Sequence, residues 1–228
     1  LWIKQESPTI EDRPFITWPR QDEYVTRLAE TRKKVIEDQE GVARGDIVSE
    51  KPREVGWSWL NLAEGLHIAR YTPGATCLIA SRVEYDVDAI GASKTLFWKL
   101  DYYLEHMPEW FMPDGYWHQR DGFPKRNMAN RTSSSGKIKL VIPGFGTIHG
   151  SATHENCGRS GRFYWMMLDE FAHADRGQTG MGEKIWTATT KTCRLRRALS
   201  SPFGRGNKFE KLVHSGDVEV FSVKWYED

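Results

Sequence analysis

The stretch Lys51-Pro-Arg-Glu-Val-Gly-Trp-Ser58 decides the expected fold, because it joins a short strand-like segment to a helical one. Residues 46–50 precede it, and apolar residues recur at helical intervals from Trp59 until Pro73 and Gly74 end the pattern. A glycine at such a junction lets backbone N–H groups approach an anion, and the N-terminus of the following helix favours negative charge. The stretch therefore predicts a strand, a loop and a helix arranged around a phosphate.

A phosphate-binding loop also needs a lysine for the terminal phosphates and a hydroxyl for Mg²⁺. Ser58 supplies the hydroxyl, but Trp57 stands where a lysine commonly precedes it. Lys51 and Arg53 lie before Gly56 instead, where they can fold back to place a cation on the phosphates. By itself the motif has an ordinary alternative, which is a charged turn between a strand and a helix.

A second informative site follows the apolar run of residues 163–168, which is typical of a buried strand. The run ends in Asp169 and Glu170, and ligands bind at the carboxyl ends of parallel strands. The first carboxylate can hold a metal ion while the second activates water. The alternative is a core strand that ends in solvated acids. The order of the two sites along the chain favours a nucleotide site.

Regular patterns elsewhere extend this interpretation to a complete fold. The expected helices are 21–36, 86–106 and 183–191, and the expected strands are 76–80, 137–142, 147–151, 194–200 and 218–225. Residues 1–20 are expected to be irregular because of their prolines, and residues 108–125 because of their prolines, glycines and aromatic residues. Strands that alternate with helices predict an α/β fold with a mainly parallel sheet flanked by helices.

The composition limits the class of protein. At 228 residues the chain suits one large domain, and we expect a single domain over residues 1–228. Its 39% hydrophobic and 28% charged residues exclude disorder and collagen-like structure. No window offers the roughly 20 consecutive apolar residues that cross a bilayer, so no membrane partner is expected. A formal net charge of +1 does not by itself indicate a nucleic acid.

The cysteines and histidines argue against a disulfide framework and a zinc site. Cys77, Cys157 and Cys193 are an odd number, lie far apart and form no CxxC pair, which favours a reducing cytosol. The spacing of His149, His154, Cys157 and His173 fits no standard zinc site, so we expect polar loop residues there.

Basic and aromatic residues offer weaker signals. The tryptophan-rich residues 110–117 can stack on bases, but aromatic side chains that pack on the surface are an equal alternative. Scattered solvated charge is the default for the basic residues, which could otherwise touch DNA phosphates: Lys125, Arg126, Arg131, Arg194, Arg196 and Arg197.

Together the two motifs resemble the ATPase domain of the large terminase subunit, the DNA-packaging motor of tailed bacteriophages. The family's phosphate loop (Walker A) is a deviant one, K-x-R-x-x-G-x-S/T, with the lysine at the front. The matching residues are Lys51, Arg53, Gly56 and Ser58, and Asp169 and Glu170 match the acidic pair (Walker B).

Flanking blocks extend the resemblance along the chain. RPFITWPRQ (13–21) is similar to the family's adenine-binding segment, in which Gln21 would read the adenine edge. LSSPFGRGN (199–207) is similar to a stretch whose hydroxyl pair, here Ser200 and Ser201, couples hydrolysis to movement. Arg159 matches the arginine that reaches a neighbouring subunit's nucleotide, and Arg162 is the second choice.

The resemblance implies a RecA-like (ASCE) P-loop NTPase fold. Residues 1–45 would form the adenine-binding segment and first helix, and residues 46–228 the P-loop core. ATP and Mg²⁺ would be the cofactors. Ser58 and Asp169 would hold Mg²⁺, Lys51 and Glu170 would be catalytic together with an arginine finger, and the loop with Arg53, Trp57 and Trp59 would bind the nucleotide. The segment 194–197 departs from the family, because it is basic where the family has an apolar strand.

The family also implies the biological role: Mg²⁺-dependent ATP hydrolysis that drives double-stranded DNA into a viral procapsid. The implied partners are a ring of identical subunits, the portal protein and the small terminase subunit, in the cytoplasm of an infected bacterium. The family's C-terminal nuclease is expected to be absent from this chain. Two alternatives stay open, a helicase-type ATPase and a non-hydrolysing nucleotide-binding module; the second is favoured if Trp57 blocks the loop.

Overall fold

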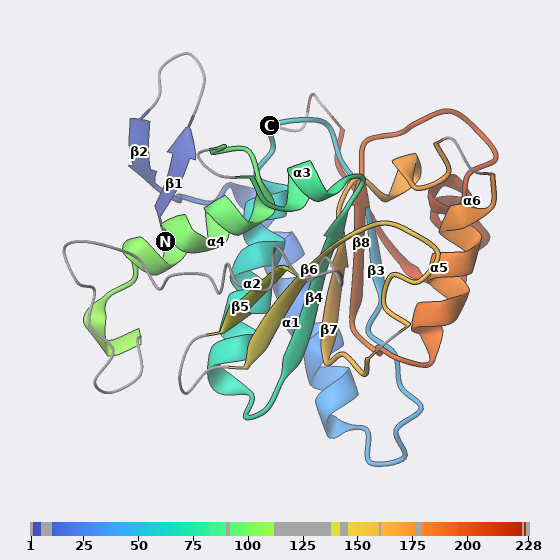
Figure 1. Cartoon of the computed structure of the whole chain (residues 1–228), viewed down its shortest axis with the longest axis horizontal. Helices are drawn as coiled ribbons and strands as arrows, with labels where there is room; N and C mark the ends of the chain where they lie inside the picture. Colours follow the sequence, from blue (N-terminus) through green and yellow to red (C-terminus); the bar gives the residue numbers. More distant parts are fainter. Residues whose placement is uncertain are drawn as a thin grey trace.

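A computed structural model of the chain describes residues 2–5, 11–89, 92–111, 138–141, 146–159, 161–176, 179–224 and 226. Its centre is a seven-stranded sheet in the order β5-β6-β4-β7-β8-β3-β9 (Figure 1). Only β5 is antiparallel to its neighbour. The strands are β3 (Ile47–Glu50), β4 (Thr76–Ser81), β5 (Ile138–Val141), β6 (Thr147–Ala152), β7 (Trp165–Leu168), β8 (Arg196–Ser200) and β9 (Glu219–Ser222).

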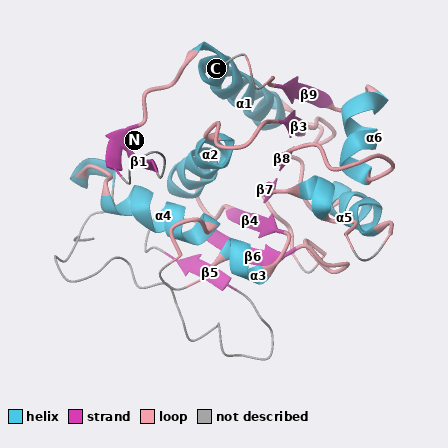
Figure 2. Cartoon of the chain, turned by 90° about the horizontal axis from the view of Figure 1, so that it is seen from above, coloured by secondary structure: helices cyan, strands magenta, loops and turns pink. Residues whose placement is uncertain are grey.

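Helices cover both faces of the sheet, as the view from above shows (Figure 2). One face carries α1 (Pro19–Glu37), α2 (Trp57–Tyr71) and α4 (Leu96–Glu105). The other face carries α5 (Met181–Thr190) and α6 (Lys208–Ser215). The short elements are α3 (Glu84–Val87) and two 3-10 turns, η1 (Glu109–Phe111) and η3 (Phe171–His173). None of the described helices is both long and apolar enough to cross a bilayer.

Alternate residues of the central strands fill two separate cores. In β7, Trp165 and Met167 pack on the side of α2, whereas Met166 and Leu168 pack on the side of α5. A parallel strand that is buried on both faces reads as an unbroken apolar run, because both sets of side chains leave water. This is the physical origin of the run at residues 163–168.

The expected α/β fold with a mainly parallel, helix-flanked sheet is confirmed. In the sheet, β8 stands between β3, which precedes the glycine loop, and β7, which precedes the acidic pair. The central strands 76–80, 147–151 and 194–200 were therefore located correctly to within a few residues.

The N-terminal prediction was wrong in part. Residues 1–20 are not wholly irregular, because β1 (Trp2–Gln5) and β2 (Glu11–Pro14) form an antiparallel hairpin. Pro19 does not break the chain but begins α1, where a proline is favoured since the first N–H groups of a helix have no intrahelical acceptor.

Two helix predictions also need correction. The helix expected at 86–106 is divided into α3 and α4, and Thr95 caps the second by accepting a hydrogen bond from the Trp98 backbone N–H at 3.3 Å. Helix α6 was not expected. It begins where the Asn207 side chain accepts from the Glu210 N–H at 2.9 Å, and it ends at Gly216 in a left-handed conformation.

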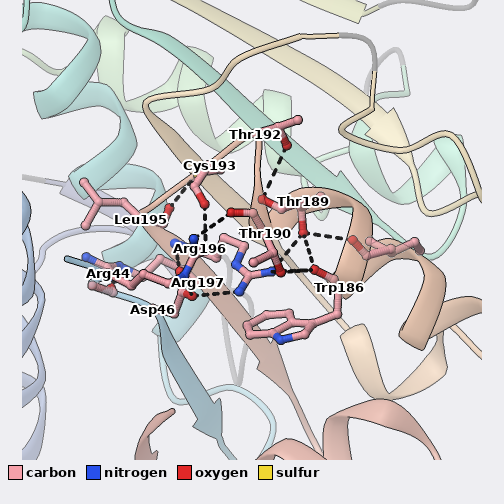
Figure 3. A network of polar contacts seen from close by, with 12 residues as sticks. Arg44, Asp46, Trp186, Thr189, Thr190, Thr192, Cys193, Leu195, Arg196 and Arg197 are labelled. Atoms are coloured by element: carbon pink, nitrogen blue, oxygen red, sulfur yellow. Dashed lines mark hydrogen bonds and ion pairs between the residues drawn. The ribbon is translucent and has the colours of Figure 1, made fainter. Parts of the chain in front are cut away.

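Arg196 and Arg197, at the start of β8, are buried, so neither solvated charge nor DNA contact describes them, whereas Arg194 stays partly exposed. Arg197 is 0% exposed and its guanidinium donates two hydrogen bonds of 2.8 Å to the Glu64 carboxylate. Arg196 lies 2.7 Å from Asp46 and stacks 3.6 Å above the Trp186 ring (Figure 3). Acidic partners and carbonyl acceptors explain the burial, because a buried charge is tolerated when it is paired.

Candidate functional site

The predicted phosphate loop and the acidic pair lie together at the carboxyl edge of the sheet. The Ser58 hydroxyl is 3.3 and 3.4 Å from the two carboxylate oxygens of Asp169. The Lys51 ammonium nitrogen lies 3.6 Å from Oε1 of Glu170. Four residues that the sequence singled out for one reaction are thus neighbours in space, although the two segments are far apart in the chain.

The backbone around these side chains is strained at two places. Glu54, in the loop, has a φ of 64°, and Glu170 has a φ of 52°. Non-glycine residues seldom occupy this left-handed region, and each costs about 1–3 kcal/mol. Gly56 has a φ of 75° and precedes the first residue of α2, a position that only glycine adopts easily. Strain of this kind is concentrated at ligand sites.

The end of β8 lies against the phosphate loop. The Lys51 backbone N–H donates to the Ser200 carbonyl at 3.1 Å, and Ser201 follows as a half-buried residue. Ser200 is 0% exposed, and its hydroxyl has no hydrogen-bond partner among the described residues. A buried polar atom without a partner is rare in proteins.

Gln21 ties helix α1 to the loop. Its amide nitrogen donates to the Val55 carbonyl at 3.0 Å, and its amide oxygen accepts from the Trp18 N–H at 3.2 Å. The side chain is 3% exposed. The predicted adenine-reading residue therefore stands beside the loop, with both ends of its amide engaged.

The two tryptophans that flank Ser58 do not project into the site. Trp57 is 1% exposed and stacks on Tyr24, with ring centroids 5.0 Å apart. Trp59 packs edge-on against Tyr103, whose hydroxyl donates to the Trp59 carbonyl. Only the backbone N–H groups of these tryptophans are therefore placed to meet a nucleotide, since the first N–H groups of a helix lack intrahelical acceptors.

The predicted arginines differ in their relation to this cluster. Arg159 is exposed and lines a groove along α5 together with Glu183 and Lys184. Arg162 is exposed and precedes β7, whereas Glu170 follows that strand, so the two residues lie at opposite ends of β7. Arg53 is exposed within the loop. A role for Arg159 or Arg162 in a neighbouring subunit's site stays a prediction, as do DNA contacts by Lys125, Arg126 and Arg131, which lie outside the described residues.

One residue at the site was missed by sequence reasoning. His173, in η3, places Nε2 3.6 Å from Oε2 of Glu170. Burial lowers the pKa of His173; Glu170 opposes that shift, and Arg82, Arg176 and Arg53 add to it. Sequence reasoning considered His173 only as a zinc ligand, although its position three residues after Glu170, in the turn beyond a strand, was a usable signal.

Ser58 and Asp169 are the residues that suit Mg²⁺, because this ion takes oxygen ligands and keeps several waters. Their three oxygens converge within hydrogen-bond distance at the point where the phosphate loop begins α2. In the described part of the chain, no group of three or more His, Cys, Asp and Glu side chains could hold a metal ion. Cys157, one of the residues considered for zinc, lies in the apolar core and is 1% exposed.

No protein-family model matches the sequence, and no curated protein matches it significantly. Solved structures do match. The large terminase of the thermophilic bacteriophage D6E superposes with a TM-score of 0.53 at 10% identity, over 86% of this chain and 44% of that one. A mutant ATPase domain of the Thermus phage P74-26 large terminase gives a TM-score of 0.49 at 16% identity, over 89% and 85%.

The likeness is therefore one of fold, and this chain spans less than half the length of the D6E protein. The chain has the RecA-like α/β fold that the bacteriophage D6E large terminase also contains.

Proposed function

We propose that this chain is an Mg²⁺-dependent ATPase that drives double-stranded DNA into a viral procapsid. The observation that carries the proposal is the convergence of Lys51 and Ser58 on Glu170 and Asp169 at the carboxyl edge of the sheet. Phosphoryl transfer to water needs positioning and charge neutralisation more than covalent chemistry, and this cluster offers both.

The loop and the start of α2 would bind the phosphates. The N–H groups of Trp57, Ser58 and Trp59 point out of the N-terminus of a 15-residue helix, where a negative ion is favoured. Lys51, which is 7% exposed, would exchange its contact with Glu170 for the terminal phosphate. Arg53 would add charge from the exposed side of the loop, and Gln21 would hold the adenine.

The acidic pair would divide the remaining work. Asp169 and Ser58 would hold Mg²⁺, which supplies positive charge against the charge that builds on the transferred phosphoryl group. Glu170 would orient the attacking water and take its proton on a carboxylate oxygen. Ser200, whose hydroxyl is buried without a described partner, and Ser201 lie next to Lys51, where they would sense the state of the loop.

The larger assembly follows from the same proposal. Arg159 is exposed on the groove along α5, which suits an arginine that completes the site of a neighbouring subunit in a ring. Such a finger contributes about 10³–10⁵-fold to the rate in related chemistry. The portal protein, the small terminase subunit and the host cytoplasm complete the proposed setting. The likeness to the D6E large terminase motivates this proposed setting.

The non-hydrolysing module loses its main argument. That alternative was favoured if Trp57 blocked the loop, but the Trp57 side chain lies in the core against Tyr24.

The test is the rate of phosphate release from ATP by the purified chain, with and without Mg²⁺ and double-stranded DNA. Glu170→Gln is expected to reduce kcat by about 10²–10⁴-fold because it removes the base. Glu40→Gln, at an exposed turn, is the matched control and is expected to hydrolyse at the wild-type rate. Equal rates for Glu170→Gln and the wild type would overturn the assignment. Strand displacement on a forked duplex would point to the helicase-type alternative.

A further inference from the structure

The carboxylate of Glu170 is held from both sides. Lys51 Nζ lies 3.6 Å from Oε1, and His173 Nε2 lies 3.6 Å from Oε2. The two contacts differ in origin, because Lys51 belongs to the phosphate loop while His173 belongs to the turn that Glu170 itself begins. Both contacts are longer than a hydrogen bond, as catalytic contacts often are before the substrate binds.

The imidazole of His173 is itself fixed in place. Its ring packs on Phe203 in a tilted arrangement, with centroids 4.0 Å apart and planes 34° apart. The side chain is only 11% exposed, and Nδ1 is buried without a hydrogen-bond partner among the described residues. Because burial and three nearby arginines lower the pKa of His173 while Glu170 opposes them, the ring is neutral near pH 7 and carries one N–H. Glu170 is the polar group that its Nε2 faces.

We propose that His173 is a positioning residue for the attacking water: its Nε2–H donates to Oε2 of Glu170 once ATP is bound, and Phe203 supports the ring. This inference rests on the proposed ATPase function. When a phosphate takes Lys51 away, Oε1 is released, whereas Oε2 keeps its contact with His173. The carboxylate then presents one free oxygen in a fixed direction, and that oxygen can receive the proton of the water. Phe203 lies in the segment after β8, so the orientation of Glu170 also depends on that segment.

Two substitutions separate hydrogen bonding from packing. His173→Gln places an amide nitrogen as many bonds from Cα as Nε2, so it keeps the donor and loses the aromatic ring. His173→Phe keeps a ring that can stack on Phe203 and loses the donor. If His173 positions Glu170, His173→Phe should lower kcat by roughly 10- to 100-fold, since small misplacements of catalytic groups have effects of this size. His173→Gln should retain most of the wild-type kcat.

The measurement is steady-state ATP hydrolysis by the whole chain, with binding of a fluorescent ATP analogue and thermal unfolding recorded for each variant. KM and analogue affinity should stay close to wild type in both variants, because His173 faces Glu170 and not the phosphate loop. Phe203→Ala should lower kcat less than His173→Phe, since it frees the imidazole without removing it.

Each other pattern of results contradicts the inference. An unchanged kcat in His173→Phe would show that the imidazole donor has no role. Equal losses in the two histidine variants, or a loss confined to His173→Gln, would show that packing of the ring matters and not hydrogen bonding. A rise in KM with unchanged kcat would place His173 in substrate binding. If the wild-type chain hydrolyses no ATP, the proposed function fails. If the wild-type chain hydrolyses ATP and His173→Phe is equally active, only this inference fails.

Discussion

The hydroxyl oxygen of Ser58 lies 3.3 Å from Oδ1 of Asp169, across the gap between the start of α2 and the end of β7. The two residues come from different βα units, and β8 separates their strands in the sheet. Parallel strands bring their carboxyl ends to one edge, so the contact is a consequence of the topology. A hard cation bound between these oxygens would join the two halves of the site.

Replacement of Ser58 by alanine should weaken the dependence on Mg²⁺ without unfolding the protein. The substitution removes one of the oxygen ligands, so half-maximal ATP hydrolysis should require at least about tenfold more Mg²⁺. Ser58→Thr keeps the hydroxyl and is the control. A magnesium titration of the ATPase rate distinguishes them, and identical titration curves for Ser58→Ala and wild type would exclude Ser58 as a ligand.

Trp57→Phe should leave ATP hydrolysis close to the wild-type rate, because the ring packs between Tyr24 and Phe221 in the core and not against a nucleotide. Trp57→Ala should instead lower the free energy of unfolding by about 3–5 kcal/mol through the cavity it leaves. Chemical denaturation measures the second effect. A normal unfolding curve for the alanine variant, together with altered nucleotide affinity, would place the side chain in the site after all.

Glu64→Gln should destabilise the fold strongly. The Glu64 carboxylate is the paired partner of Arg197 and also accepts from the Trp165 indole N–H at 2.9 Å. Removing one charge of a buried pair leaves the other uncompensated and costs about 3–5 kcal/mol. Glu23→Gln breaks an exposed pair with Arg20 and should change the free energy of unfolding by less than about 1 kcal/mol. Urea titrations of both variants give the comparison.

The cysteines should be unreactive in the native protein. Burial raises the pKa of Cys157 to about 11 and that of Cys193 to about 12, and it raises the pKa of Cys77 further. A raised thiol pKa means less thiolate at a given pH, and the thiolate is the reactive form. A colorimetric thiol reagent at pH 8 should therefore detect no cysteine until denaturant is added, and all three afterwards. Rapid labelling of the folded chain would contradict the burial of these thiols.

Local patterns in the sequence were enough for the central strands and for the two motifs. Lys51, Gly56 and Ser58 lie close together in the sequence, and the acids follow their strand directly, so neighbouring residues carry the signal. The burial of Arg196 and Arg197 could not be read locally, because Asp46 and Glu64, which neutralise them, lie more than 100 residues earlier. Scattered surface charge and buried ion pairs have the same appearance in a one-dimensional pattern.

His173 was missed for a related reason. Its position depends on the turn that η3 makes after Glu170 and on Phe203, which lies in the segment after β8. The division between α3 and α4 depends in turn on a cap by Thr95, a single hydrogen bond that the apolar spacing of 86–106 conceals. Caps and stacked rings are decided by tertiary structure more than by periodicity.

Lys51 and Glu170 can hold each other only while no phosphate competes for the ammonium group. In the proposed reaction, Lys51 therefore keeps the Glu170 carboxylate paired until a nucleotide binds. A terminal phosphate offers the lysine more negative charge than one carboxylate does, so the binding of ATP breaks the contact between Lys51 and Glu170. Nucleotide binding and release of the general base are then one event, and a subunit without nucleotide has no free base with which to activate water.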